Sequence, residues 1–94
     1  MAPCVYIMAN RPGGTLYVGV TSDLLKRVFL HRTSAIPGFT ARYGCTRLVW
    51  FEQHETMEFA ILREKQLKAG SRTAKIALIE RMNPHWRDLY PDLA

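Results

Sequence analysis

Cysteine is scarce in this chain, which holds only Cys4 and Cys45 among its 94 residues. Two cysteines cannot build the disulfide framework of a small secreted domain, and their spacing to the three histidines matches no zinc-binding pattern. We therefore expect free thiols, no disulfide-linked partner and a cytoplasmic location.

Long apolar stretches are also absent. No segment approaches the roughly 18 consecutive apolar residues that a membrane-spanning helix needs. The N-terminus has no basic segment followed by an apolar run, so it does not look like a secretory leader. We expect no membrane association and no processing of the chain.

Acidic residues are few, since eight Asp and Glu stand against 13 Lys and Arg, which gives a net charge of +5 and a pI near 9.6. This balance favours polyanionic partners, with nucleic acid first among them, although charge by itself only supports that reading. Apolar residues make up 48% and charged residues 22%, as in ordinary globular proteins. A chain of this length is enough for one domain, 1–94, that buries roughly 60 to 70% of its unfolded surface.

Glycine and proline fall mainly between segments with regular patterns. Residues 4–9 are apolar or aromatic, residues 15–20 alternate, and residues 10–14 between them are rich in turn formers. This order predicts an antiparallel hairpin. If Tyr6 lies opposite either Tyr17 or Gly19, the two-residue period of a strand places both phenols on the same face of the sheet.

A helix is predicted from about residue 23 to the low thirties, because capping side chains at 21–23 precede apolar residues at helical spacing. Arg27 and His31 then lie one turn apart on the same flank and can point together at a ligand. The remaining expected elements are a helical turn over 40–43, a strand over 48–54, a helix from Thr56 to Gly70, a helix from Ser71 or Thr73 to Asn83, and an aromatic tail that packs on the body. The expected fold class is a small α+β domain with a three-stranded antiparallel or mixed sheet flanked by helices.

Taken in order, these segments resemble the GIY-YIG nuclease superfamily, in particular its small stand-alone members. Val5-Tyr6-Ile7 and Tyr17-Val18-Gly19 stand where the family carries its two signatures, and Arg27 and His31 follow at suitable positions. The stretches 63–68 and 83–89 are similar to the family's metal-binding helix and to the ending of its small members. The resemblance covers nearly the whole chain.

Several positions depart from the family pattern. Val5 and Ile7 replace the outer residues of the first signature, and Val18 replaces the central Ile of the second. Val20 stands where some members place a lysine, so a phosphate contact available to those relatives is missing and activity is expected to be weaker or differently tuned.

The resemblance implies a phosphodiester hydrolase in which Glu64 holds one divalent cation, Mg²⁺ or Mn²⁺, and Tyr6 acts as general base or proton relay. A single hard carboxylate with retained waters suits Mg²⁺. Tyr17 would lie on the phosphate, and Arg27 would bind two phosphate oxygens through its guanidinium. His31 could orient water or shuttle a proton. We also expect Arg27, His31 and the metal to lower the pKa of Tyr6, since a free phenol is a poor base at neutral pH.

Four further residues are candidates for substrate binding: Gly19, Asn83, Tyr43 and Lys68. Each also has a structural explanation. Gly19 could allow close approach of another backbone, and Asn83 could end a helix before Pro84. Tyr43 could pack locally, and Lys68 could belong to a solvated basic face or pair with Glu64 one turn earlier.

The sequence therefore predicts a metal-dependent DNA endonuclease, with a structure-specific role in DNA repair or recombination implied by the resemblance. One alternative is a nucleic-acid-binding module that has lost turnover on the same scaffold. Another is a protein-interaction domain, which would show no salt-sensitive affinity for DNA. The sequence does not indicate an oligomeric state or distinguish DNA from RNA.

Overall fold

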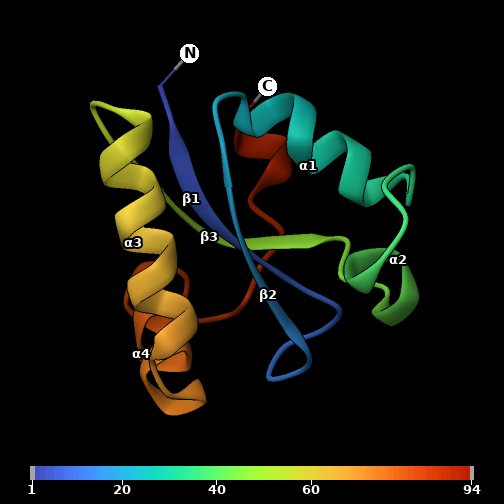
Figure 1. Ribbon diagram of the computed structural model, residues 1–94. Coiled ribbons are helices and arrows are strands. Elements are labelled where there is room, and N and C mark those ends of the chain that lie inside the picture. The colour runs from blue at the N-terminus through green and yellow to red at the C-terminus, as the bar shows by residue number, and fades with distance from the viewer. Residues whose placement is uncertain (1, 94) are drawn as a thin grey trace.

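The computed structural model describes residues 2–93. The chain begins with a hairpin of β1 (Cys4–Ala9) and β2 (Leu16–Thr21), followed by α1 (Leu24–Arg32) and α2 (Phe39–Tyr43). The second half contains β3 (Arg47–Gln53), α3 (Met57–Ala69), α4 (Arg72–Met82) and a closing 3₁₀ turn, η1 (Tyr90–Leu93) (Figure 1). Helices and sheet occur in the order that the sequence predicted.

The three strands form one antiparallel sheet in the order β2-β1-β3. This confirms the α+β class and decides for an antiparallel rather than a mixed sheet. In the hairpin Tyr6 pairs with Gly19, and Met8 pairs with Tyr17. Of the two predicted registers, the one that places Tyr6 opposite Gly19 is therefore correct, and both phenols lie on the same face.

The pairing of β1 with β3 contains a bulge. Ile7 pairs with Trp50 and Met8 with Leu48, so the register passes over Val49. A bulge of this kind places two successive residues on the same side of a sheet. Val49 and Trp50 accordingly both belong to one apolar cluster, whereas Leu48 belongs to the other.

Side-chain caps fix the starts of the three long helices. Asp23, Thr56 and Ser71 each accept a hydrogen bond from the backbone N–H three residues later. These bonds satisfy donors that the first turn of a helix leaves free. All three caps fall where the sequence placed them, and Ser71 rather than Thr73 starts α4.

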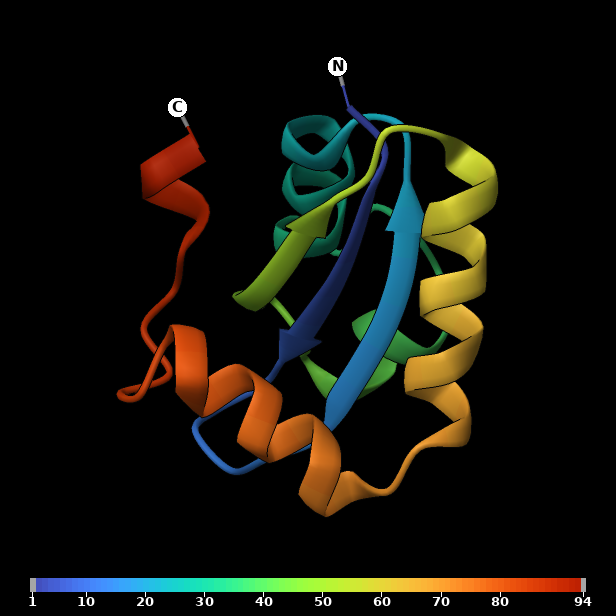
Figure 2. The ribbon, with the colours of Figure 1, turned by 90° about the vertical axis from the view of Figure 1, so that its left-hand side faces the viewer.

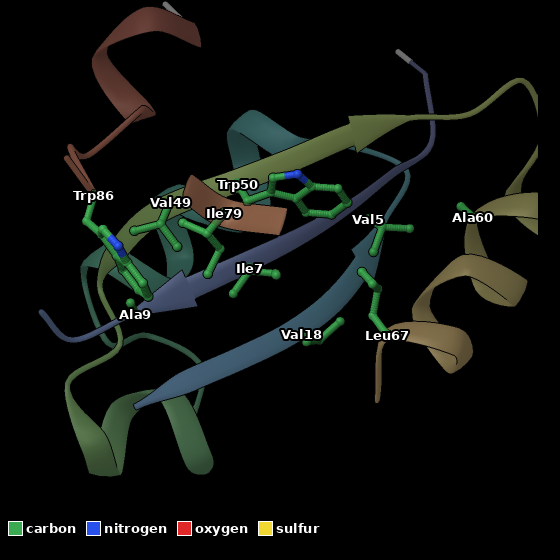
Figure 3. Packing of buried hydrophobic residues seen from close by; sticks show 10 residues of the cluster. All are labelled: Val5, Ile7, Ala9, Val18, Val49, Trp50, Ala60, Leu67, Ile79 and Trp86. Atoms are coloured by element: carbon green, nitrogen blue, oxygen red, sulfur yellow. The ribbon is translucent and has the colours of Figure 1, made fainter. Parts of the chain in front are cut away.

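The two faces of the sheet are covered by different elements (Figure 2). Helices α3 and α4 cover one face, and α1 and α2 lie on the other. The cluster under α3 and α4 is built from strand, helix and tail residues, seen in Figure 3: Val5, Ile7, Ala9, Val18, Val49, Trp50, Ala60, Leu67, Ile79 and Trp86. Because β1 is covered on both sides, all six of its residues are buried.

The tail returns to the sheet, as expected from its aromatic composition. Trp86 and Leu89 are buried, and the Leu89 N–H donates to the carbonyl of Leu48. Cys4 and Cys45 are buried free thiols. Among the described helices, none has both the length and the apolar character that crossing a bilayer requires.

Candidate active site

The centre of the site is a hydrogen bond between a strand and a helix. Tyr6 Oη of β1 and His31 Nε2 of α1 are 2.8 Å apart, and both side chains are almost fully buried. Gly19 makes room for the phenol, because a Cβ at this position would come within 2.4 Å of Tyr6 Cζ and Oη. Gly19 therefore makes room for the side chain of Tyr6, a role that was not predicted from the sequence.

Thr40 holds the far side of the imidazole and was missed by the sequence reasoning. Its Oγ1 lies 3.0 Å from His31 Nδ1, and the threonine is buried. Both ring nitrogens thus have partners, which fixes the orientation of the ring. No sequence signal pointed to Thr40, because it follows His31 by nine positions across the loop between α1 and α2, and only the fold brings the two side chains together.

Burial determines the protonation of this pair. Burial raises the pKa of Tyr6, and so do the charges of Tyr17 and Glu64, while Arg27 lowers it in part. Burial also lowers the pKa of His31, with a further decrease from Arg27. We expected positive neighbours to lower the pKa of Tyr6 toward neutral pH. For the protein alone this expectation was wrong, because the effect of desolvation on the pKa is larger than that of the Arg27 guanidinium. Both groups are neutral at pH 7.

Arg27 lies on the exposed flank of α1. Within residues 2–93 its guanidinium forms no ion pair. It lines a hollow of about 460 Å³ with neighbours from the start of α1. Its charge lowers the pKa of both Tyr6 and His31, so the guanidinium lies near the phenol–imidazole pair.

Glu64 belongs to α3, in the second half of the sequence. Its carboxylate is nevertheless close enough to Tyr6 to raise the pKa of the phenol. Its side chain is 16% exposed and pairs with Lys68 Nζ at 3.2 Å. Residues 2–93 contain no cluster of three or more His, Cys, Asp or Glu that could bind a metal. A lone carboxylate is nevertheless what Mg²⁺ uses when substrate phosphate and water supply its other ligands.

Tyr17 completes the aromatic part of the site. Its ring centroid is 6.3 Å from that of Tyr6 and 5.4 Å from that of His31. Unlike Tyr6 it is only half-buried. On its outer side Tyr17 stacks on Phe39, which in turn contacts Tyr43, so Tyr43 is joined to the site through Phe39.

Asn83 is not brought to this group. Its Nδ2 donates to the carbonyls of Val49 (3.1 Å) and Arg87 (2.7 Å), and its Oδ1 accepts from the Arg87 N–H (3.0 Å). Val49 is the residue that the bulge leaves out of the sheet register, so the amide supports the bulge and the turn after α4. The structure thus assigns the side chain of Asn83 to backbone support.

Comparison with known protein families identifies the one to which this chain belongs. The family model of the GIY-YIG catalytic domain matches residues 2–77. The chain belongs to the GIY-YIG family. The matched region includes Tyr6, Tyr17, Arg27, His31 and Glu64, whereas Asn83 lies beyond it.

The chain is also similar to small proteins of comparable length. A UPF0213 protein of Staphylococcus saprophyticus is 32% identical over 75 residues, which are 80% of this chain and 90% of that protein. A UPF0213 protein of Clostridium perfringens is 35% identical over 75 residues, 80% of each. The solution NMR structure of a UPF0213 protein from Bacillus halodurans matches with a TM-score of 0.58 and 27% identity, covering 94% of this chain and 93% of that one.

Proposed function

We propose that this GIY-YIG protein is a DNA endonuclease that hydrolyses phosphodiester bonds with the help of one divalent cation. The observation that carries the proposal is the buried hydrogen bond between Tyr6 Oη and His31 Nε2. A phenol joined to a neutral imidazole can accept a proton at its oxygen while giving its own proton to the ring nitrogen. The family match supports nuclease-type chemistry at this position.

In the proposed reaction a water molecule attacks the phosphorus atom, and its proton passes to Tyr6 Oη. The phenolic proton moves at the same time to His31 Nε2, so no free phenolate forms. The raised pKa of Tyr6 makes a stepwise phenolate costly and favours this concerted transfer. Thr40 Oγ1 can accept a hydrogen bond from Nδ1 of the resulting imidazolium and so stabilise it.

Arg27 and Tyr17 are the proposed contacts to the scissile phosphate. Arg27 has a guanidinium with no ion pair within residues 2–93, and Tyr17 is the more exposed of the two phenols. A guanidinium can bind two non-bridging oxygens and offset the negative charge that grows on them in the transition state. As the P–O bond breaks, the leaving oxygen takes its proton from solvent.

Glu64 is the residue that would hold the divalent cation, which when bound acts as a Lewis acid on a phosphoryl oxygen. The carboxylate is mostly buried and faces Lys68 in the protein alone. Replacing that ammonium by a metal would leave Lys68 free for the substrate backbone. The net charge of +5 supports a polyanionic substrate, and a structure-specific role in repair or recombination is part of the proposal.

The test compares cleavage of branched, nicked and plain duplex DNA by the wild type and by Glu64→Ala and Arg27→Ala, with Mg²⁺, Mn²⁺ or chelator. Matched controls are Glu58→Ala, on an exposed position of the same helix, and Arg81→Ala, on exposed α4. We expect metal-dependent strand scission that both site variants abolish and both controls retain.

Two results would reject the proposal. Equal cleavage by the wild type and both site variants would place any activity elsewhere. Salt-sensitive DNA binding without scission under any metal condition would favour the alternative of a binding module that has lost turnover.

A further inference from the structure

A row of aromatic rings leads away from the catalytic pair. The centroids of Tyr17 and Phe39 are 6.1 Å apart with planes inclined by only 30°, and those of Phe39 and Tyr43 are 4.6 Å apart. Phe39 is 45% exposed and Tyr43 is 44% exposed, although Thr40 between them is buried against His31. The short helix α2 therefore holds two aromatic faces toward solvent next to the reacting groups.

The inner end of this row forms one wall of a hollow. The cavity has a volume of about 320 Å³, which lies within the size range of small-ligand sites. Its lining combines strand β2, the exposed phenylalanine and two lysines: Leu16, Tyr17, Val18, Phe39, Lys68 and Lys75. The lining thus combines two aromatic rings and apolar strand residues with two ammonium groups.

The two lysines differ in how their charge is used. Lys75 Nζ donates to the carbonyl of Gly70 at 2.8 Å, a neutral partner that leaves its positive charge uncompensated. Lys68 faces Glu64. A ligand with a flat unsaturated ring and an adjacent anion would match this lining, because the ring can lie on Phe39 while the anion meets the Lys75 ammonium.

We infer that this hollow is a nucleotide subsite that takes an unpaired base beside the scissile phosphate. The inference rests on the proposed function and specifies its substrate: single-stranded DNA or DNA with an extrahelical nucleotide. In an intact duplex the faces of each base are covered by its neighbours, so a base cannot lie on Phe39 without the cost of unstacking. The aromatic row therefore favours DNA in which the base is already unstacked, because such DNA does not pay that cost on binding.

Binding in the presence of chelator tests the subsite apart from the chemistry. The probes are a fluorescently labelled single-stranded DNA, the blunt duplex of the same sequence, and that duplex with one bulged nucleotide. The proteins are the wild type, Phe39→Ala, Phe39→Leu and Phe59→Ala. Phe59 is the matched control, since it is 58% exposed on α3 and does not line the hollow.

Phe39→Ala is expected to weaken binding of the single strand and of the bulged duplex by roughly 5- to 150-fold, the range measured for loss of one base–aromatic contact. Binding of the blunt duplex should change less than about twofold, and Phe59→Ala should behave as the wild type. Phe39→Leu keeps an apolar side chain at the start of α2 and loses the ring, so it should show most of the same loss.

Equal effects of Phe39→Ala and Phe59→Ala would overturn the subsite, as would an equal loss on single strand and duplex. A wild-type dimer that Phe39→Ala converts to a monomer would also overturn it, since the ring would then serve self-association. Parallel cleavage assays with Mg²⁺ separate the two proposals. If binding depends on Phe39 but no DNA is cleaved, the subsite stands and the endonuclease proposal is rejected. If DNA is cleaved but neither binding nor cleavage depends on Phe39, the endonuclease proposal stands and the subsite is rejected.

Discussion

The two faces of β1 show how one strand serves two purposes. Val5, Ile7 and Ala9 point into a cluster made of apolar side chains, whereas Cys4, Tyr6 and Met8 point to the face covered by α1. Both faces are equally well buried. On the first face packing alone stabilises the fold, while on the second a phenol, an imidazole and a threonine hydroxyl are buried in a chain of hydrogen bonds.

One face of β1 therefore contributes mainly to stability, and the other carries the groups proposed to act in catalysis. Buried polar groups are compatible with a stable fold only when each has a hydrogen-bond partner. Removing one partner costs more stability than replacing the whole group of hydrogen-bonded side chains by apolar ones. Tyr6, His31 and Thr40 satisfy one another and so tolerate burial. We therefore expect substitutions on the two faces to have opposite signatures, the first in unfolding and the second in catalysis.

The largest expected effect is that of Tyr6→Phe on the rate of cleavage. Removing one hydroxyl breaks the proposed proton path, which should lower kcat by roughly 10²- to 10⁴-fold. The loss of a buried hydrogen bond should cost only about 1 to 3 kcal/mol of unfolding free energy. Single-turnover cleavage and urea unfolding measure the two quantities. Tyr90→Phe is the control, and a kcat equal to that of the wild type would remove Tyr6 from the mechanism.

Ile7→Ala should show the reverse pattern. Ile7 is fully buried in the apolar cluster, so its truncation should cost about 2 to 5 kcal/mol of unfolding free energy. At a temperature where the variant remains folded, kcat should stay within a few-fold of the wild type. Ile61→Ala, at a position 36% exposed, should cost about 0.5 kcal/mol or less. A collapse of kcat in folded Ile7→Ala protein would mean that the two faces are coupled.

Asn83→Ala decides between the two readings of that residue. The three hydrogen bonds of the amide to backbone predict a loss of about 1 to 3 kcal/mol of stability with cleavage and DNA affinity unchanged. Thermal unfolding and a binding titration measure both. If the variant keeps its stability but loses affinity for DNA, the predicted substrate role is right and the structural one is not.

A smaller effect should appear in the pH dependence of stability. The pKa of His31 is below its ordinary 6.5, so the unfolded chain binds more protons as pH falls below about 6.5 and stability declines there. The pKa of Tyr6 is above its ordinary 10.0, so the unfolded chain loses its proton first and stability declines as pH rises above about 10.

Urea unfolding across this pH range separates the two contributions. His31→Gln should flatten the acidic decline, and Tyr6→Phe should reduce the alkaline one, whereas Ile7→Ala should lower the whole profile by the same amount. The buried thiols of Cys4 and Cys45, whose pKa values are also raised, add to the alkaline decline and are unchanged in these variants. An acidic decline that persists in His31→Gln would assign it to other groups.

Local patterns were sufficient to predict the elements of the fold. The cap at Thr56, the turn-rich hairpin and the alternation of β2 depend on neighbouring residues and were predicted, whereas the start of α4 was left between Ser71 and Thr73. The shared face of Tyr6 and Tyr17 followed from strand periodicity, although the register was left between two choices.

What the sequence could not provide depends on contacts between distant segments. Thr40 reaches His31 only because α2 folds back under α1, and Phe39 becomes part of the site for the same reason. The sign of the Tyr6 pKa shift depends on how deeply the phenol is buried, which no local pattern reports. The bulge at Val49 likewise arises from the register between β1 and β3.

The contact of Gly19 with Tyr6 has a consequence for how this site can vary. A methyl group at position 19 would occupy the space of the phenol's oxygen and ring carbon together. Positions 6 and 19 therefore behave as a single steric unit, although they lie on different strands. In a library selected for folding, randomisation of position 19 alone should return glycine, and larger residues there should emerge only when Tyr6 is shortened at the same time.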